Sequence, residues 1–356
     1  MLAEETIFLT GFPGFIASRL LRRLAREGAR FLLLVQPAFA ERAQEELERL
    51  AEQAGRSVSD FTLLPGDITE LNLGMSPADL EAARSESTIL FHLAAIYDLA
   101  VARELGLRVN LEGTRNVNEF ARSLPGLGHY HYISTCYVAG KRTGRILENE
   151  LQHQAGFRNY YEETKYLAEL EVEALKSELP VTIHRPAVVC GDSRSGETAK
   201  YDGIYYLIRY LLKWPAVLSN FNIGNSDVAL NLVPVDFVVE AMATLARDPL
   251  SVGKTIQLAD PAPLTTRELF NTIARSVAGR ESRITIPASL VEFSLMLPLA
   301  PKISGLPHSA VPYFFLKQNY DPAQATELLK PHGISCPPFK SYASTIVDYA
   351  RRHPAL

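Results

Sequence analysis

The sequence of 356 residues lacks the features that mark several special classes of protein. Its three cysteines, Cys136, Cys190 and Cys336, are too few and too far apart for a disulfide framework or a zinc site. We therefore expect a reducing compartment, the cytoplasm, and no bound metal. A net charge of -4 offers no basic surface, so we expect no nucleic-acid partner.

Long apolar runs are also missing. The first residues lack the basic and apolar regions of a signal peptide. The longest apolar stretch, residues 290–300, is interrupted by Glu292, Ser294 and Pro298 and is too short to span a bilayer, so no transmembrane segment is expected. Residues 290–299 could instead belong to the core, a dimer contact or a membrane-surface helix, and a homodimer is left open.

The sequence does contain a regular alternation of short apolar runs and amphipathic segments. Apolar strands that alternate with helices indicate a parallel sheet covered on both faces. The predicted fold class is therefore α/β, a Rossmann doubly wound parallel sheet. We expect strands over residues 6–9, 31–35, 61–64, 88–93, 130–134 and 181–184, and helices over 15–26, 38–53, 108–124 and 160–176.

The alternation loosens after Arg185-Pro186, which suggests a second, smaller domain. We expect residues 1–198 to form the dinucleotide-binding domain and residues 199–356 to form a mainly α-helical substrate-binding region. Residues 235–260 contain one more helix and strand and are expected to return to the first domain. The predicted helices of the second region cover residues 201–214, 266–278, 287–297, 321–329 and 342–352.

Two glycines stand between the first strand and the first helix. Glycine lets the backbone turn tightly and approach a pyrophosphate, whose charge is favoured at a helix N-terminus. The glycines are three residues apart, unlike the usual dinucleotide fingerprint, and a plain strand–turn–helix corner is the alternative. The predicted phosphate-binding residues are Gly11, Phe12, Pro13, Gly14, Phe15 and Ile16.

The ends of the next strands supply further cofactor contacts. After the second strand, an acid bonds the ribose of NAD and an arginine accepts the 2′-phosphate of NADP. Gln36 occupies this position, and Arg42 is the nearest basic residue after it. Arg42 could contact the 2′-phosphate or could simply be a solvated residue of the helix. We expect NADP(H) in preference to NAD(H). The other predicted contacts are Asp67, which could bond adenine or merely close a turn, together with Ile68, Leu93, Ala94 and Ala95.

Tyr161 and Lys165 are four residues apart at the start of a predicted helix, so both side chains lie on one face. A nearby ammonium stabilises phenolate and lowers the pKa of tyrosine. Thr135, at the end of the fifth predicted strand, can bond a substrate oxygen beside the tyrosine hydroxyl. The same Tyr-to-Lys interval occurs at 137/141 and 313/317, but neither pair begins a long helix after a strand-end Ser/Thr pair.

These segments, in this order, resemble the extended short-chain dehydrogenase/reductase superfamily. The motifs that carry the resemblance are residues 10–17, 110–114, 134–135, 161–165, 184–186 and 233–236. The resemblance implies that Thr135, Tyr161 and Lys165 are catalytic, that Asn110 supports an active-site water network, and that Pro186 and Val188 contact the cofactor. Residues 66–74, 134–140 and 191–193 are most similar to the thioester-reductase and fatty-acyl-CoA-reductase branch.

The resemblance implies an NAD(P)H-dependent oxidoreductase that reduces an acyl thioester or a carbonyl group. A sugar-nucleotide epimerase or dehydratase, a steroid-type dehydrogenase and a non-catalytic dinucleotide-binding regulator are the alternatives. We expect an apolar small-molecule substrate, with ordinary core packing as the other role for the residues of its predicted wall. That wall comprises Tyr97, Tyr137, Phe157, Tyr201 and Tyr205, with Val188 and residues 287–315.

Overall fold

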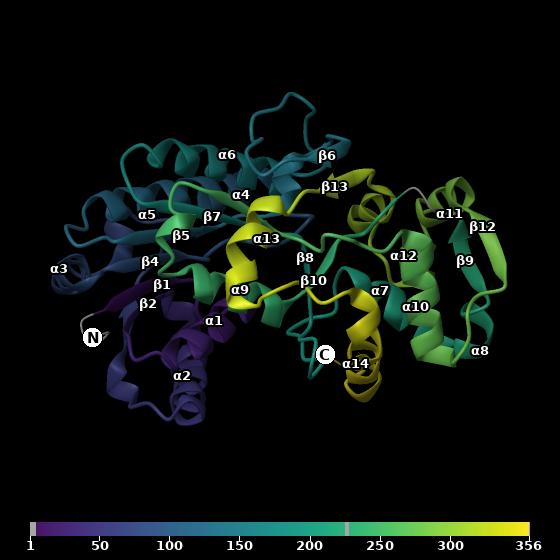
Figure 1. Ribbon diagram of the computed structural model, residues 1–356, viewed down its shortest axis with the longest axis horizontal. Coiled ribbons are helices and arrows are strands. Elements are labelled where there is room, and N and C mark those ends of the chain that lie inside the picture. Colours follow the sequence, from purple (N-terminus) through teal and green to yellow (C-terminus); the bar gives the residue numbers. More distant parts are fainter. Residues whose placement is uncertain (1–4, 225–227, 356) are drawn as a thin grey trace.

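The computed structural model describes residues 5–224 and 228–355, and its centre is one seven-stranded sheet (Figure 1). The strands lie in the order β11-β7-β5-β4-β1-β2-β3, and all neighbouring strands are parallel. The order reverses between β1 and β4, as in a doubly wound Rossmann sheet, which confirms the predicted fold class. The strands are β1 (Thr6–Thr10), β2 (Arg30–Val35), β3 (Phe61–Pro65), β4 (Ile89–His92), β5 (His129–Ile133), β7 (Val181–Pro186) and β11 (Thr255–Leu258).

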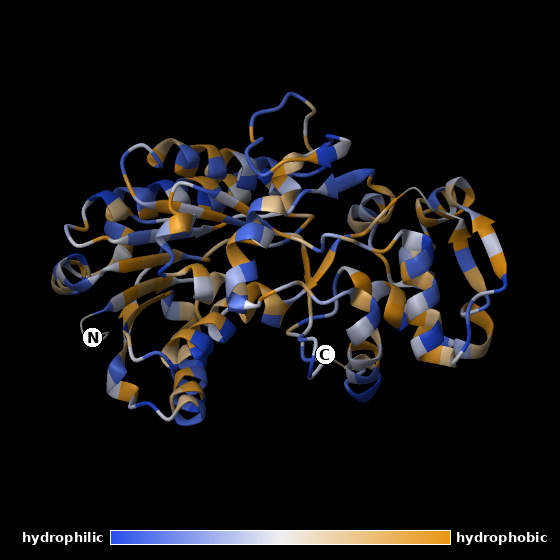
Figure 2. Ribbon diagram, viewed as in Figure 1, coloured by the Kyte–Doolittle hydropathy of each residue, from blue (hydrophilic) through white to orange (hydrophobic). Residues whose placement is uncertain are grey.

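Helices cover both faces of the sheet, because its strands carry apolar side chains on both sides. One face packs against α1 (Phe15–Ala25), α2 (Ala40–Ala54) and α9 (Val235–Leu245). The other packs against α3 (Pro77–Glu86), α5 (Gly113–Arg122) and α6 (Tyr160–Leu175). The outer helices mix polar and apolar residues in Figure 2, as amphipathic covering helices should.

Two of the predicted helices begin differently in the structure. The helix predicted over residues 108–124 is composed of α4 (Arg103–Gly106), a π-helical segment (Leu107–Glu112) and α5. The helix predicted over residues 38–53 begins at Ala40, because Pro37–Phe39 form a 3-10 turn that starts with the proline. The π-helical segment is the more consequential difference, since it contains Asn110.

The C-terminal part builds a second hydrophobic core beside the sheet. Its helices are α7 (Ile204–Lys213), α8 (Pro215–Leu218), α10 (Thr266–Ala278), α11 (Ala288–Leu295), α12 (Ala300–Ser304), α13 (Ala323–Leu329) and α14 (Phe339–Arg352), of which α13 packs on the sheet core. Thr265 and Glu268 cap α10 reciprocally, which explains its start at Thr266. Within the described ranges, no helix is long and apolar enough to cross a bilayer.

Three short parallel strand pairs were not predicted. They join β6 (Gly144–Ile146) to β13 (Gln318–Tyr320), β8 (Val188–Cys190) to β10 (Leu232–Pro234), and β9 (Phe221–Gly224) to β12 (Ile284–Pro287). Strands of three or four residues are too short to display an alternating pattern. Two of these pairs connect the region after β7 to segments near the carboxyl edge of the sheet, where the predicted site lies.

Candidate active site

The loop between β1 and α1 passes very close to the end of β4. Gly11 has a φ of 94°, and a Cβ atom there would lie 2.8 Å from the backbone nitrogen of Ala94. A Cβ atom on Gly14 would lie 2.6 Å from the carbonyl oxygen of Gly11. No side chain caps the first turn of α1, so its N–H groups face this narrow loop. The cradle fits a dinucleotide pyrophosphate, which lies at this position of a Rossmann sheet.

Gln36 and Asp67 meet at the ends of β2 and β3. The Gln36 amide nitrogen Nε2 donates a hydrogen bond of 2.8 Å to Asp67 Oδ2. The backbone nitrogen of Thr69 donates at 2.8 Å to Asp67 Oδ1, so this carboxylate also closes a turn. Asp67 thus closes a turn, which was the structural role considered for it. It lies beside Gln36 at the ends of β2 and β3, where the cofactor is expected.

The other predicted cofactor residues surround the same edge of the sheet. Phe12 and Ile68 have buried side chains, so only their backbone can face a cofactor, and Phe15 and Ile16 pack partly on the core. The Ala94 nitrogen donates to Thr10 Oγ1 at 3.1 Å, which fixes the segment that includes Leu93 and Ala95. Pro186 ends β7, and Val188 is half-buried beside the apolar cluster around Tyr161.

His92, in the same strand as this segment, is a structural residue. Its ring nitrogens bond the hydroxyls of Thr10 at 2.8 Å and Thr114 at 3.1 Å. Burial lowers the pKa of His92 to about 3, with a smaller lowering by Lys165. The imidazole is therefore neutral and serves to fix β4 against the neighbouring helix.

Tyr161 lies in the first turn of α6, beside Thr135 at the end of β5. Asn159 sets this position, because its Oδ1 accepts a hydrogen bond of 3.0 Å from the Glu162 nitrogen and caps the helix. Burial raises the pKa of Tyr161, and a hydrogen bond with the Thr135 hydroxyl lowers it less strongly. The sequence predicted that Lys165, and not Thr135, would lower the pKa of Tyr161. The net upward shift keeps the phenol protonated near neutral pH, as a proton donor requires.

Lys165 is directed toward the end of β5. Its Nζ donates to the Tyr132 hydroxyl and to the Ile133 carbonyl oxygen, both at 2.8 Å. Burial lowers the pKa of Lys165 to about 7, although Glu169 raises it. An ammonium has three N–H donors, so one remains for a further acceptor such as a ribose hydroxyl.

Asn110 joins the segment after β4 to α6. Its Oδ1 accepts from the Ile96 nitrogen at 2.9 Å, and its Nδ2 donates to the Thr164 hydroxyl at 3.1 Å. The π-helical segment around Asn110 brings this buried amide between the two elements. Asn110 therefore fixes the backbone beside Lys165, whereas its predicted part in a water network stays a prediction.

A buried charged network behind Thr135 was not predicted from the sequence. Glu169 lies one turn after Lys165 on α6, and one of its oxygens accepts a hydrogen bond from Ser134. Its other oxygen accepts from the Arg185 guanidinium, with Nε at 2.8 Å. The network ties α6 to the ends of β5 and β7. The sequence carries no local signal of this network, because Ser134, Glu169 and Arg185 lie in three separate segments of the chain.

Aromatic and aliphatic side chains form an apolar cluster around Tyr161. Tyr137, Tyr313 and Val101 are buried in it, with Ile96, Leu99 and Leu316 packed against them. The Tyr97 ring meets the Tyr161 ring edge-on, with centroids 5.2 Å apart. Tyr137 belongs to a 3-10 turn that ends at Gly140, and the Tyr313 hydroxyl donates to Glu162 at 2.6 Å. The 3-10 helix that contains Tyr313 ends at Phe315, so neither tyrosine shares a helix with the lysine four residues later.

The remaining predicted substrate residues belong to other packing groups. Tyr201 and Tyr205 lie in the C-terminal core; the Tyr201 hydroxyl donates to the His353 carbonyl, and the Tyr205 hydroxyl accepts from the Gly191 nitrogen. Phe157 packs on His153 and Tyr166. Their contact with substrate stays a prediction.

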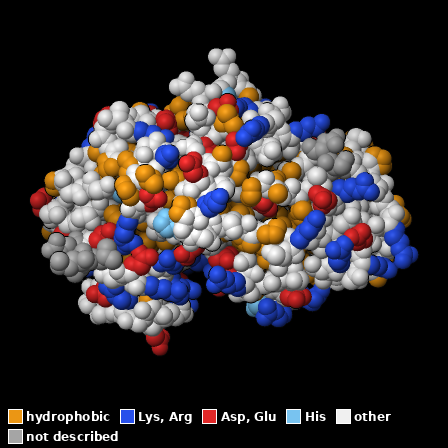
Figure 3. Space-filling model, in the orientation of Figure 1, with side chains coloured by type: hydrophobic (Ala, Val, Ile, Leu, Met, Phe, Trp, Pro, Cys, Tyr) orange, Lys and Arg blue, Asp and Glu red, His pale blue; other side chains and the backbone are white. Residues whose placement is uncertain are grey.

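The helix α11 and the residues after it are largely exposed. Most of residues 290–299 therefore do not belong to the hydrophobic core, which was one of the roles considered for them. Figure 3 shows the molecule in the orientation of Figure 1, with apolar and charged side chains interspersed on the visible face. The exposed apolar side chains are Leu290, Phe293, Met296, Leu297 and Leu299.

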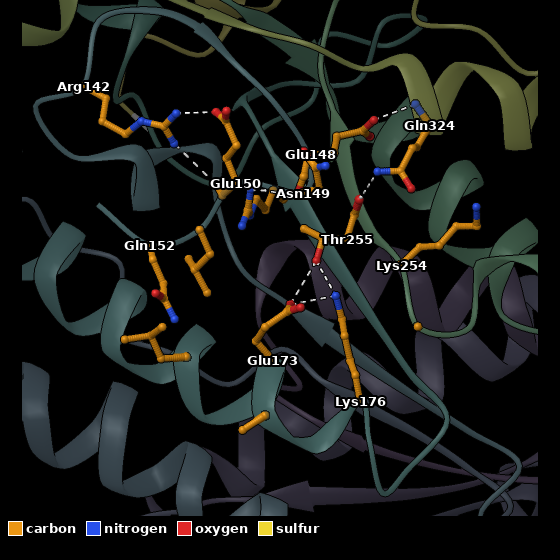
Figure 4. A pocket seen from close by; sticks show the side chains of 15 residues that line it. Arg142, Glu148, Asn149, Glu150, Gln152, Glu173, Lys176, Lys254, Thr255 and Gln324 are labelled. Atoms are coloured by element: carbon orange, nitrogen blue, oxygen red, sulfur yellow. Dashed lines mark hydrogen bonds and ion pairs between the residues drawn. The ribbon is translucent and has the colours of Figure 1, made fainter. Parts of the chain in front are cut away.

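A polar cavity of about 750 Å³ lies between α6, the loop after β6 and the start of β11 (Figure 4). Two ion pairs lie within its lining: Arg142 with Glu150, and Lys176 with Glu173 at 2.7 Å. The cavity borders Arg185, but it contains none of the residues predicted to bind cofactor or substrate. We assign no ligand to it.

Cys136, next to Thr135, is buried, and burial raises the pKa of its thiol. Its sulfur donates to the Arg185 carbonyl at 3.2 Å. A thiol held in this way is a packing residue and a poor nucleophile. Residues 5–224 and 228–355 contain no group of three His, Cys, Asp or Glu side chains arranged to hold a metal ion.

The doubly wound sheet, the glycine loop at its switch point and the positions of Thr135, Tyr161 and Lys165 agree with the resemblance to the extended short-chain dehydrogenase/reductase superfamily. Residues 9–242 match the family described as male sterility protein, a family of NAD-binding domains, and the chain belongs to that family. The match confirms the predicted superfamily and branch.

Curated relatives carry reductase names. The glycine betaine reductase ATRR of Emericella nidulans is 27% identical over 289 residues, which cover 76% of this chain and 22% of that protein. The fatty acyl-CoA reductase wat of Drosophila melanogaster is 23% identical over 281 residues, which cover 69% of this chain and 54% of that one. The chain thus spans about a fifth and about half of the lengths of these relatives.

Solved structures share the fold over nearly the whole chain. The terminal R domain from the myxalamid PKS-NRPS biosynthetic pathway has a TM-score of 0.82 and 24% identity, covering 99% of this chain and 92% of that one. UDP-glucuronic acid 4-epimerase from Bacillus cereus, in complex with NAD, has a TM-score of 0.66 and 18% identity, covering 98% and 97%. At these identities the likeness shows the fold alone.

Proposed function

We propose that the protein reduces an acyl thioester or another carbonyl compound, and that its hydride donor is NADPH. The position of Tyr161 beside Thr135, where the turn after β5 meets the first turn of α6 and an apolar cluster, carries this proposal. When bound, the nicotinamide supplies hydride to the carbonyl carbon. The glycine loop, in which a side chain would clash with the end of β4, would hold its pyrophosphate.

The side chains of the site supply the proton and hold the reacting oxygen. Tyr161, kept protonated by burial, gives its proton to the carbonyl oxygen. The Thr135 hydroxyl orients that oxygen and stabilises the charge developing on it. Lys165 binds a ribose hydroxyl through its third N–H. With a thioester, the resulting hemithioacetal loses its thiol and releases an aldehyde, so no cysteine nucleophile is needed.

The apolar surroundings of Tyr161 support an acyl or carbonyl substrate. Tyr97, Tyr137 and Val188 would contact its chain, since all three lie against the cluster that contains Tyr161. The names of the relatives support a reductase. We further propose that residues 1–198, with 235–260, bind the dinucleotide, that residues 199–356 otherwise bind substrate, and that the protein acts in the cytoplasm, where its three free thiols would stay reduced.

The test is oxidation of NADPH and NADH measured against a panel of acyl-CoAs, aldehydes and ketosteroids. We expect turnover with acyl-CoAs or aldehydes and a preference for NADPH. Tyr161→Phe should lose most turnover and retain cofactor binding, because it removes only the proton donor. Unchanged turnover in Tyr161→Phe would refute its role. If none of these compounds supports cofactor oxidation and the purified protein carries tightly bound NAD, an epimerase is favoured.

A further inference from the structure

The end of β2 carries neither of the side chains that ordinarily distinguish the two nicotinamide cofactors. Gln36 and Pro37 stand where an acid would bond the ribose of NAD or an arginine would accept the 2′-phosphate of NADP. The Gln36 amide is engaged by Asp67 at 2.8 Å. This strand end therefore has no cation with which to recognise a phosphate.

A cation reaches the same place from the following helix. Arg42 lies in the first turn of α2, and its Nη2 donates to the Pro13 carbonyl oxygen at 3.2 Å. Only the 3-10 turn Pro37–Phe39 separates α2 from the end of β2, where the adenosine ribose of a dinucleotide lies in a Rossmann fold, so Arg42 stays near that ribose while it contacts the glycine loop.

The guanidinium of Arg42 is exposed and forms no ion pair within residues 5–224 and 228–355. Nearby arginines differ in this respect: Arg22 of α1 pairs with Glu46 at 3.6 Å, and Arg49 of α2 pairs with Glu45 at 3.7 Å. A cation in the first turn also opposes the helix dipole, so helix stability does not account for Arg42. Its planar fork of N–H donors suits a phosphate.

We infer that Arg42 is the residue that selects NADP(H), by binding the phosphate on the 2′ position of the adenosine ribose. The inference rests on the proposed function, since it concerns the cofactor of that site. On this inference, the discrimination between NADP(H) and NAD(H) depends on a residue of α2 and not on the residues at the end of β2.

Calorimetric titration of the full chain with NADPH, NADH and 2′,5′-ADP tests the assignment without any turnover. The wild type should bind NADPH more tightly than NADH. Arg42→Gln should weaken NADPH and 2′,5′-ADP by about tenfold to a hundredfold, the usual range for lost hydrogen bonds to a charged group, and leave NADH unchanged. Arg42→Lys should retain part of the preference as a point charge.

Arg49→Gln is the matched control, because Arg49 is exposed on the same helix and pairs with Glu45. It should bind both cofactors as the wild type does. Equal weakening of NADPH and NADH in Arg42→Gln, or no weakening of NADPH, would overturn the assignment. If the wild type binds neither dinucleotide, the proposed function itself fails; if it binds both equally and still turns over substrate, only the role of Arg42 is refuted.

Discussion

Replacing Glu169 with leucine tests whether the network behind Thr135 supports the active site. The Glu169 side chain is completely buried and that of Arg185 is 2% exposed, so Glu169→Leu leaves a guanidinium inside the protein without its counter-charge. Two other acceptors of Arg185, the carbonyl oxygens of Glu148 and Glu150, lie 3.3 and 3.5 Å from Nη1 and carry no net charge. Removing one partner of a buried pair costs about 3–5 kcal/mol. We expect a loss of that size in the free energy of unfolding.

The double variant Glu169→Leu/Arg185→Met separates the charge from the packing. A well-packed apolar replacement of a buried pair is often neutral or stabilising, so it should recover most of the loss. The hydrogen bond from Ser134 to Glu169 stays absent in this variant. If that bond positions the adjacent Thr135, the double variant should be stable and still turn over more slowly than the wild type.

Urea unfolding followed by far-ultraviolet circular dichroism measures these stabilities. The single tryptophan, Trp214, is 70% exposed and is a poorer reporter of unfolding. The reasoning is refuted if Glu169→Leu lies within about 1 kcal/mol of the wild type, below the range for a broken buried pair. It is equally refuted if the double variant is as unstable as the single one.

Two further measurements address the cofactor cradle and the sheet. Gly11→Ala should abolish dinucleotide binding in calorimetry, since its Cβ would meet the backbone of Leu93 and Ala94 after β4. Gly55→Ala, with φ of 64° and open space around it, should bind normally. Acid should destabilise the protein from about pH 6.5 down to about pH 4, because burial lowers the pKa of His129 to about 4 and of His184 to about 3, while both take up protons near 6.5 in the unfolded chain. Between about pH 7 and about pH 5.5, each of these histidines should lower the free energy of unfolding by about 1 kcal/mol, measured by urea unfolding. His129→Gln should show a smaller loss of stability over this range. Equal stability of the wild type at both pH values would contradict this account.

Most of the sheet could be predicted, because strands such as β1, β2 and β4 are apolar runs that a helix follows. The short strands outside it could not be. β6 covers three residues, and its partner β13 lies far along the chain, so neither has a local pattern that marks it. The π-helical segment around Asn110 was also hidden, since the periodicity of residues 108–124 is that of an ordinary helix. Its amide contact with Thr164 depends on how α6 packs.

The site was predictable in its residue types and only partly in its geometry. Four-residue spacing placed Tyr161 and Lys165 on one face of α6, as the structure has them. The direction of the ammonium is set by Tyr132 and Ile133 of another strand, which spacing along α6 cannot indicate. The position of Arg42 likewise depends on α2 returning past the glycine loop, so the sequence left it indistinguishable from a solvated helix residue.

Burial explains why the pKa of Tyr161 is raised, whereas the sequence predicted that Lys165 would lower it. A lysine lowers the pKa of a neighbouring tyrosine only when it is charged, and burial favours the neutral form of both side chains. With a pKa of about 7, Lys165 is near half protonation at neutral pH, so an acceptor on its third N–H would shift it toward the ammonium. The lowering of the Tyr161 pKa that the sequence predicted therefore requires such an acceptor, which would keep Lys165 charged.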